Sequence, residues 1–484
     1  GIRRFRDILK SIEKFEPGDR KSSGMMRFHL RWLAVVGLVF AAGAVDECRA
    51  LDLVGYVPSY RMSASYESNI LPTQLSMLNE VRYFGLTAAS DGSIVPLPMT
   101  GTLQDNLNRI TTIQQIINTL PPAQRPRLDI TIGGAGQDAT FTNIASTLNG
   151  VPCNLCTTFA QNVKSLLDTT GATSVDIDWE NPDAGVERTT SYPDMLKRIK
   201  TAVGANRRVY AVVDPTVMIS NSVVNGANAI DGVSLMTYDL GWWGNDPANP
   251  YQGEHSLPVY VTNSVDAWTE PAGSHNDRNW VFGSWGNNVP SADLGVGLPF
   301  YAHTVTGADA TATYSDLVSG GTLLPPDPSR PGPGDYYSYQ GQTYWLPGPA
   351  LSAQRVQFAH SRGLQNVFIW ELGQDVDPTS PNSLLRSAFL ANETLKGDFN
   401  GDHLMDASDY EIWRSTNGST TDLRADANGN GVIDAADYVI WRQSATSAGS
   451  GVAVGSEVPE PTLFSLLVIA TASFCVSRAG KKDL

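Results

Sequence analysis

The chain has only four cysteines among its 484 residues. Cys48 lies in an N-terminal segment that we expect to be removed, and Cys475 lies in a C-terminal apolar segment. Cys153 and Cys156 are therefore left for the folded part. Two thiols cannot complete a zinc site without histidine or carboxylate partners, and the sequence indicates none for them. In an exported protein, so close a pair favours a small disulfide over a redox centre.

Positive charge is also scarce, because 34 Lys and Arg face 49 Asp and Glu, which gives a formal net charge of -15. Nucleic acid is disfavoured as a partner, since binding phosphates requires a basic face. An uncharged polymer such as a polysaccharide is compatible with this balance. The 11 Trp and 17 Tyr offer flat apolar surface for sugar rings, although aromatic side chains more often belong to a core.

The first 50 residues have the features of a leader. A basic start at 27–31 precedes an apolar run over 32–44, and small residues follow it. This pattern predicts a signal peptide over about residues 25–50, and hence a secreted or cell-surface protein. Residues 1–24 are polar and precede two methionines, so we expect them to lie upstream of the true start. A cytoplasmic tail before a membrane anchor is the open alternative.

From Leu51 onward, eight short apolar runs predict strands, and several are separated by segments of helical periodicity. The predicted strands are Leu53–Val57, Val81–Leu86, Arg127–Gly133, Ser174–Glu180, Arg208–Asp214, Gly232–Asp239, Leu294–Tyr301 and Asn366–Leu372. The predicted helices include Leu103–Thr119, Phe159–Leu167 and Tyr192–Val203. Strands that alternate with helices imply a parallel sheet, and eight such units over residues 51–391 predict an α/β fold of the (β/α)8 TIM-barrel type. A doubly wound open sheet is the alternative.

The stretch over about residues 302–350 is too long for a simple loop. It contains a proline-rich part followed by residues of β character at Tyr336–Trp345. We expect a small α+β insertion beside the mouth of the barrel.

The predicted strand Ser174–Glu180 carries three carboxylates on one face, because side chains alternate along a strand. Asp176, Asp178 and Glu180 share this face, whereas Val-x-Ile-x-Trp occupies the other. Repulsion and partial burial push such carboxyls toward the neutral form, which a merely structural strand has no reason to accept. Glu180 would stand at the C-terminal rim, where barrels of this type hold their active sites. A solvated edge strand is the alternative, but the apolar face demands burial.

The run Asp176-Ile177-Asp178-Trp179-Glu180 resembles the catalytic signature of glycoside hydrolase family 18, the chitinase and endo-β-N-acetylglucosaminidase family. Four further segments resemble motifs of the same family, in the same order, on the third, sixth, seventh and eighth strands. They are Thr131–Gly134, Met236–Asp239, Gly297–Tyr301 and Phe368–Glu371. Two departures are Thr173-Ser174, where the family usually has Asp-Gly, and Thr131 in place of Ser. Both lie behind the rim, so we expect altered packing or pKa support more than lost catalysis.

The resemblance implies retaining hydrolysis assisted by the substrate's own N-acetyl group, with no carboxylate nucleophile and no catalytic cofactor. Glu180 would protonate the glycosidic oxygen and then act as base toward water. Asp178 would orient the acetamido group, and Asp176 would share a proton with Asp178. Tyr238 would donate a hydrogen bond to the acetamido oxygen, with Asp239 assisting.

Five further residues are predicted to contact the sugar. Trp370 resembles the family's sugar platform, Met236 would form the floor, and Tyr301 ends the seventh-strand motif. Trp242 and Trp243 follow the sixth strand, where lining the cleft and packing within the loop are equally compatible with the sequence.

The implied substrate is chitin or a related β-1,4-linked N-acetylglucosamine glycan. An endo-β-N-acetylglucosaminidase and a peptidoglycan-directed hydrolase are alternatives within the same class. From other classes, a catalytically dead chitin-binding lectin and a surface scaffold with an incidental barrel stay open. Such lectins typically lose the acid, and Glu180 is present.

After residue 391 the composition changes, and residues 397–445 contain two similar acidic repeats. Their oxygen-bearing positions match positions 1, 3, 5, 7, 9 and 12 of a calcium loop, with the backbone carbonyl used at position 7. They are Asp398, Asn400, Asp402, Leu404, Asp406 and Asp409 in the first repeat, and Asp426, Asn428, Asn430, Val432, Asp434 and Asp437 in the second. An isolated loop of this kind is often a plain Asx-turn, but a duplicated one is far more specific.

The repeat pair resembles a type I dockerin, a small all-α module, which implies structural Ca²⁺ and a cohesin-type partner. His403 stands at the sixth position of the first loop, where Gly is usual, so we expect weaker calcium binding there. Residues 446–457 form a predicted linker. Residues 458–484 resemble a PEP-CTERM sorting signal, which implies a transient C-terminal membrane anchor and processing by an exosortase. An ordinary residual C-terminal anchor is the alternative.

Overall fold

The structure, a computed structural model, describes most of the chain between Leu51 and Ser447. The described residues are 51–146, 153–183, 185–240, 253–271, 275–276, 284–285, 287–305, 310–326, 330, 332–400, 406–428 and 430–447. The predicted leader and sorting signal lie outside them, as do Trp242, Trp243, Asp402 and Leu404. In the described part, no helix is both long and apolar enough to cross a membrane.

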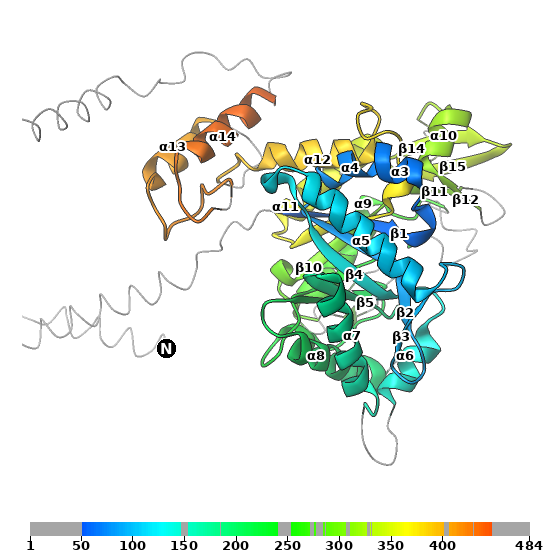
Figure 1. The fold of residues 1–484 in the computed structure, drawn as a ribbon. Helices are drawn as coiled ribbons and strands as arrows, with labels where there is room; N and C mark the ends of the chain where they lie inside the picture. The colour runs from blue at the N-terminus through cyan, green and yellow to red at the C-terminus, as the bar shows by residue number, and fades with distance from the viewer. Residues whose placement is uncertain are drawn as a thin grey trace, which may run out of the picture.

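Eight parallel strands close into a barrel at the centre of the molecule (Figure 1). They are β1 (Asp52–Pro58), β2 (Glu80–Ala88), β4 (Arg127–Gly133), β5 (Ser174–Asp178), β6 (Arg208–Val213), β7 (Gly232–Leu235), β10 (Leu294–Pro299) and β16 (Asn366–Trp370). Because β1 pairs with both β2 and β16, the sheet closes on itself. The (β/α)8 barrel prediction is confirmed, and the open doubly wound sheet is excluded.

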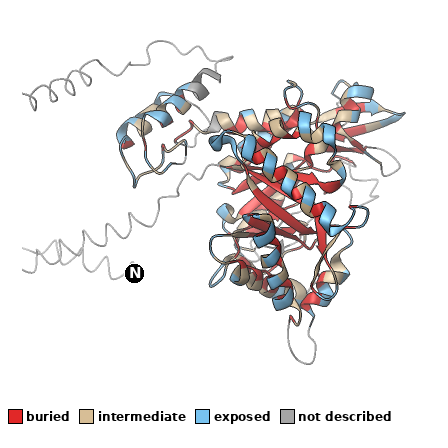
Figure 2. Ribbon diagram, in the orientation of Figure 1, coloured by how far each residue is buried: buried red, intermediate tan, exposed pale blue. Residues whose placement is uncertain are grey.

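Helices surround the barrel, and Figure 2 shows that they bury one side and expose the other, while the barrel strands are mostly buried. Helix α5 illustrates the cause: Ile110, Ile113 and Ile117 recur at helical spacing and are buried against the strands. A capping box of Thr102 and Asp105 starts this helix. The helices around the barrel are α3 (Ala64–Asn69), α4 (Leu71–Leu75), α5 (Leu103–Thr119), α6 (Asp138–Ala145), α7 (Cys156–Thr170), α8 (Tyr192–Val203), α9 (Pro258–Thr269), α11 (Gly348–Ser361) and α12 (Leu384–Leu395).

Five predicted strands end one to four residues earlier than expected, among them the two that carry the proposed catalytic residues. The strand predicted over Ser174–Glu180 ends at Asp178, and the one predicted over Gly232–Asp239 ends at Leu235. At the rim the chain leaves the hydrogen-bonded ladder, although alternation of side chains continues for a residue or two. The motif residues after these ends therefore stand on loops at the mouth of the barrel, where they are free to face a ligand.

An antiparallel sheet with one helix is inserted between β10 and α11 (Figure 1). Its elements are β11 (Tyr301–Thr304), β12 (Thr311–Thr313), α10 (Tyr314–Gly320), β13 (Thr322–Leu323), β14 (Asp335–Tyr339) and β15 (Gln342–Leu346). Tyr336 and Trp345 of this sheet belong to one buried cluster with Leu257 and Tyr260 of the α9 region. This packing anchors the α+β insertion beside the barrel.

Three short strands complete the described part of the sheets. Strand β3 (Ile94–Pro96) adds antiparallel to β2, and β8 (His275–Asn276) pairs with β9 (Ser284–Trp285). Cys153 and Cys156, at the start of α7, form a disulfide, as expected for a close pair.

The acidic repeats each lead into a helix, α13 (Ala407–Thr416) and α14 (Ala435–Ser447). A small core of their own holds them together, in which Phe399, Ile433 and Trp441 are buried. Helix α14 runs to Ser447, so its last residues fall within the stretch taken as a linker.

Candidate active site

Strand β5 separates two environments, because successive side chains point to opposite faces. On the outer face, Val175 and Ile177 are fully buried in the large apolar cluster between barrel and helices, together with Trp179 just beyond the strand end. On the inner face, Asp176 and Asp178 are buried inside the barrel. The strand is paired on both sides, with β4 and β6, so the edge-strand alternative is excluded.

Asp176, the deepest acid of the row, is held by three partners. The Tyr56 hydroxyl donates to Asp176 Oδ2 at 2.5 Å, and the Thr131 hydroxyl donates to the same oxygen at 3.3 Å. The Arg82 guanidinium lies 3.3 Å from Asp176 Oδ1. Burial raises the pKa of Asp176, while Arg82 and Tyr56 oppose this rise by favouring the charged form. Thr131, a departure from the family pattern, thus retains a hydroxyl that supports the acid.

Arg82 is a buried cation on β2 beneath the acid row, and its role was not predicted. It lies 3.0 Å from Glu80 and 3.4 Å from Asp129, and it donates hydrogen bonds to the hydroxyls of Tyr56 and Ser234. Burial and the neighbouring Glu80 raise the pKa of Asp129 well above its usual range. One cation therefore serves several buried carboxyls, which favours the neutral form for some of them.

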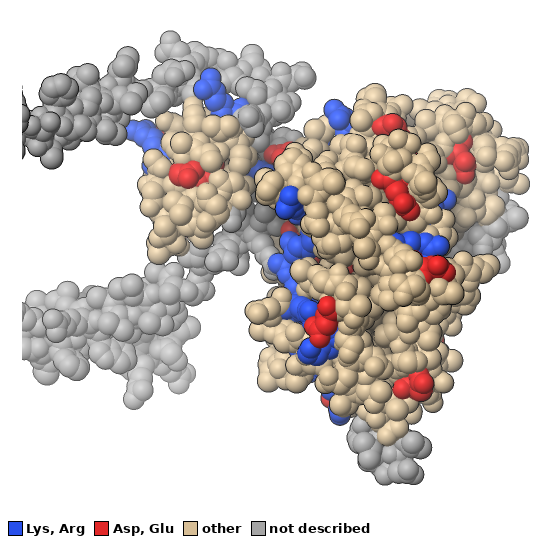
Figure 3. Space-filling view, in the orientation of Figure 1, with Lys and Arg blue, Asp and Glu red and all other residues tan. Residues whose placement is uncertain are grey.

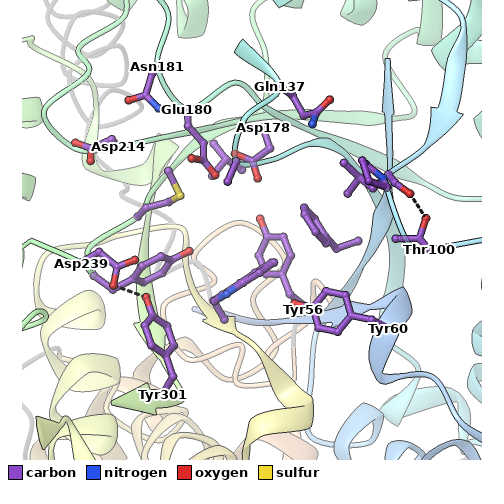
Figure 4. Close-up of a pocket in the computed structure, with 18 of the residues that line it drawn as sticks. Tyr56, Tyr60, Thr100, Gln137, Asp178, Glu180, Asn181, Asp214, Asp239 and Tyr301 are labelled. Atoms are coloured by element: carbon purple, nitrogen blue, oxygen red, sulfur yellow. Dashed lines mark hydrogen bonds between the residues drawn. The ribbon is translucent and has the colours of Figure 1, made fainter. Parts of the chain in front are cut away.

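Asp178 and Glu180 lack the partners that Asp176 has. Asp178 Oδ1 is buried with no hydrogen-bond partner among the described residues. Burial, and then the nearby charges of Glu180 and Asp176, raise the pKa of Asp178 well above its usual value. Burial also raises the pKa of Glu180 to about 7, and the charges of Asp138, Asp214 and Asp239 add to this rise. Both carboxyls point into the cavity in Figure 4.

Two glycines let β4 approach the acid row closely. A Cβ at Gly133 would lie 2.2 Å from the carbonyl oxygen of Asp178, and one at Gly134 would lie 2.7 Å from the Phe84 ring. Both glycines have positive φ, which other residues rarely adopt. The Gly134 N–H donates to the Asp178 carbonyl at 2.9 Å, so this turn helps to position the acid.

Tyr238 and Asp239 follow β7 and reach the same cavity. The Tyr301 hydroxyl donates to Asp239 Oδ1 at 2.6 Å, which Figure 4 shows as a dashed line, and His303 Nε2 lies 2.8 Å from the same oxygen. Burial raises the pKa of Asp239, but hydrogen bonds from His255 and His303 outweigh it and hold this pKa well below its usual range. The Asp239 side chain is 52% exposed by surface area, so its burial is partial and the hydrogen bonds are the firmer cause.

A cavity of about 760 Å³ opens at the C-terminal ends of the strands. Its lining includes the predicted residues Asp178, Glu180, Met236, Tyr238, Asp239, Tyr301 and Trp370. Trp370 ends β16 and packs edge-on against Tyr56 and Phe84, which fixes the plane of its ring. The structure therefore brings together the predicted site residues that it describes in the barrel, apart from Asp176, which supports them from below.

Several lining residues were not found from the sequence. Tyr56, Phe84, Gln137 and Asp214 come from four different strands or the loops that follow them, and none belongs to the five motifs. Their position at strand ends is the one signal that could have indicated them. His255 lies just before α9 and His303 lies in β11, and no local pattern indicates either.

The visible surface carries few charges (Figure 3). On this face, uncharged residues dominate; Lys and Arg side chains gather in a strip along one margin of the barrel, interspersed with acids, and a few others are scattered elsewhere.

The second acidic loop winds around its carboxylates. Asp426 accepts backbone N–H bonds from Asn430 at 3.1 Å and from Gly431 at 2.8 Å, and Asp437 accepts them from Asn428 and Asp434. Gly431, at the sixth position, has φ +80°, as a sharp turn requires. In the first loop, Asp409 accepts N–H bonds from Phe399, Asn400 and Asp406. Backbone N–H bonds to Asp426 and Asp437 therefore close the described part of the second loop.

Residues 53–375 match the family described as glycosyl hydrolases family 18. A class V chitinase of Lotus japonicus is 26% identical over 300 residues, which cover 53% of this chain and 69% of that protein. Among solved structures, a class V chitinase mutant of Cycas revoluta in complex with (GlcNAc)3 is similar with a TM-score of 0.53 and 15% identity, covering 70% of this chain and 99% of its own. A chitinase-like agglutinin of Robinia pseudoacacia is similar with a TM-score of 0.51 and 21% identity, covering 70% of this chain and 98% of its own. The fold alone is thus shared by chitinases and an agglutinin.

Proposed function

The chain belongs to family 18 of the glycosyl hydrolases and is a chitinase-like hydrolase, and on that premise we propose that it cleaves β-1,4 linkages between N-acetylglucosamine units with retention of configuration. The substrate's own N-acetyl oxygen would act as the nucleophile, since enzymes of this mechanism use no carboxylate for that step.

Glu180 is proposed as the general acid and base. A pKa of about 7 keeps a fraction of this carboxyl protonated near neutral pH, as an acid that must protonate a leaving oxygen requires. After the glycosidic bond breaks, the resulting carboxylate would take a proton from the water that attacks the oxazolinium intermediate. The same residue thus serves both halves of the reaction.

Asp178 is proposed to receive the acetamido N–H of the substrate. Its buried Oδ1 lacks a hydrogen-bond partner among the described residues, and a buried acceptor in that state gains from a donor supplied by a ligand. Asp176, fixed by Tyr56, Thr131 and Arg82, would share a proton with Asp178 and stabilise it in either form. Tyr238 would donate to the acetamido oxygen, and Trp370 would stack against the sugar ring.

One observation carries this proposal: Glu180 and Asp178 line the same cavity, and the buried Oδ1 of Asp178 has no hydrogen-bond partner among the described residues. A protein that only binds sugar does not need a carboxyl with a raised pKa, such as that of Glu180, beside the glycosidic bond. We therefore favour hydrolysis over binding alone.

The test is hydrolysis of fully acetylated chitin oligomers by the full chain, with Glu180→Gln as the matched variant. We expect product release by the wild type, loss of release in the variant, and oligomer binding by both. Binding without release by the wild type would favour a lectin. Release only from glycoprotein glycans or from peptidoglycan would overturn the substrate while leaving the mechanism in place.

We also propose that the acidic repeats bind Ca²⁺ as a dockerin-like module with a cohesin-type partner, on an exported protein whose C-terminal segment is processed by an exosortase. Asp426, Asn428, Asn430, Val432, Asp434 and Asp437 would hold the ion in the second loop. Ca²⁺ calorimetry on the full chain should show a tighter and a weaker site. The first loop should be the weaker site, because His403 replaces Gly there. Asp426→Ala should therefore remove the tighter site, and Asp398→Ala should remove the weaker one. Heat without saturation would refute both sites.

A further inference from the structure

Three side chains that the proposed reaction does not fully use converge beside the cavity. His255 and His303 are buried, and Asp239 stands in front of them with its side chain half exposed. His303 Nε2 lies 2.8 Å and His255 Nδ1 lies 3.2 Å from the same oxygen, Asp239 Oδ1. The two imidazole rings have their centroids 4.4 Å apart. One atom from each of the three residues lies within 4.8 Å of the others.

The protons available do not satisfy all of these contacts. His255 Nδ1 lies 3.1 Å from the backbone N of Asp239 and 3.2 Å from Asp239 Oδ1, and it can accept from the first or donate to the second, but it cannot do both at once. The backbone N–H and the carboxylate of Asp239 thus both face this one ring nitrogen. Asp239 Oδ1 also faces the Tyr301 hydroxyl at 2.6 Å. When His255 Nδ1 donates as well, it is the third donor on an oxygen that offers two lone pairs.

A divalent cation bound by Asp239 Oδ1 and by one nitrogen of each imidazole would take the place of these donors and would need no proton on either nitrogen. In a tetrahedral zinc site, ligand atoms at about 2.1 Å from the metal lie about 3.4 Å from one another. The separations of 2.8 and 3.2 Å on Asp239 Oδ1 therefore need only a small expansion. Two imidazoles with one carboxylate favour Zn²⁺, Co²⁺, Ni²⁺ or Cu²⁺ over Ca²⁺ and Mg²⁺, which prefer oxygen ligands.

We propose that Asp239, His255 and His303 form a binding site for a divalent transition metal of the Zn²⁺ class at the wall of the cavity. The half-exposed Asp239 gives the ion access from the cavity, and water completes its coordination. Bound metal ties up Asp239 and adds positive charge beside Glu180, so it inhibits hydrolysis. The binding claim stands apart from the proposed reaction, whereas the inhibition rests on it.

The site is tested by calorimetric titration of Zn²⁺ into the full chain after transition metals have been removed. Saturating Ca²⁺ is present, so that Zn²⁺ does not bind to the acidic loops. His303→Gln retains a donor toward Asp239 but removes the imidazole lone pair, and we expect its affinity for Zn²⁺ to fall at least about tenfold, the least that loss of a metal's supporting group costs. His360→Gln is the matched control, because His360 lies near the C-terminal end of α11, which leads into the opposite end of the barrel. Equal loss in both variants, or no loss in His303→Gln, would overturn the site.

Replacing a buried histidine can unfold a protein, so a second measurement uses the wild type alone. Co²⁺ bound to two imidazoles and a carboxylate should give strong visible absorption, whereas the weak spectrum of hydrated Co²⁺ would refute the site. Hydrolysis of chitin oligomers by the metal-free chain is measured separately. Activity without Zn²⁺ binding would refute the metal site alone, and Zn²⁺ binding without activity would refute the proposed reaction alone.

Discussion

The two ends of the acid row differ in how completely the protein satisfies them. At the lower end, Asp176 has two hydroxyl donors and a guanidinium as partners. At the upper end, Asp178 Oδ1 has no partner among the described residues, and Glu180 faces the cavity. Asp176 and Asp178 lie on β5, and Glu180 lies in the loop directly after it. These acids are spaced two residues apart, yet the two ends of the row have opposite surroundings. The lower end is built for support, and the upper end is left open for a ligand.

Changing carboxylate to amide at each end should separate these roles most strongly. Glu180→Gln removes the proposed acid, so we expect kcat to fall by about 10²–10⁴-fold. Because the raised pKa of Glu180 means that its charged form is disfavoured when folded, the melting temperature at pH 8 should not fall. Asp176→Asn should instead lower the melting temperature, because Arg82 loses a partner. Kinetics and thermal melts of the two variants check these expectations. Equal losses of stability in Glu180→Gln and Asp176→Asn would contradict the different roles of the two ends.

Removing the cation beneath the row should have the next largest effect. Arg82→Met leaves Asp129 and Asp176 buried without their counter-ion and leaves Glu80 with Arg127 alone, and we expect the free energy of unfolding to fall by about 3–5 kcal/mol. Arg207→Met is the control, since its ion pair with Asp168 is partly exposed and should contribute less than about 1 kcal/mol. Urea unfolding measures both. A loss for Arg82→Met no larger than the control's would mean that the buried acids do not need this cation.

The charge around Glu180 should set the alkaline limit of activity. The acid must be protonated, so kcat/KM should decline as pH rises through about 7. Asp138 is the first of the charges that raise this pKa, and Asp138→Asn should move the decline to lower pH. Asp168→Asn, which removes an exposed acid on α7, is the control and should leave the profile in place. A shift to higher pH in Asp138→Asn would contradict the assignment.

The smallest expected effect concerns Thr131. Its hydroxyl donates to Asp176 over 3.3 Å, a long hydrogen bond beside the much shorter one from Tyr56. Thr131→Val should therefore cost about 0.5–1.5 kcal/mol of stability and little activity, because Tyr56 and Arg82 still hold the acid. Thr131→Ser, which restores the residue usual in the family, should match the wild type. A large loss of kcat in Thr131→Val would show that this departure matters to catalysis.

The sequence predicted the barrel and the upper end of the acid row, because both are written in local alternation. Val175, Ile177 and Trp179 against three acids already define an inner and an outer face. It predicted Asp176 at the lower end, but not the partners that hold this acid. Tyr56 and Arg82 belong to strands far away in the chain, and inside a closed barrel their contacts depend on register between strands rather than on spacing within one. The positions of His255 and His303 beside the cavity could not be predicted for the same reason.

The stereochemistry of the first product tests the central claim most directly. Proton NMR can record the anomeric form of the product that the full chain releases from chitin oligomers, before mutarotation mixes the anomers. Oligomers that lack the N-acetyl group serve as the comparison. The account predicts β-anomeric product from acetylated oligomers and no cleavage of deacetylated ones, because the acetamido oxygen is the nucleophile. Product that appears first as the α anomer, or equal cleavage of both substrates, would contradict it.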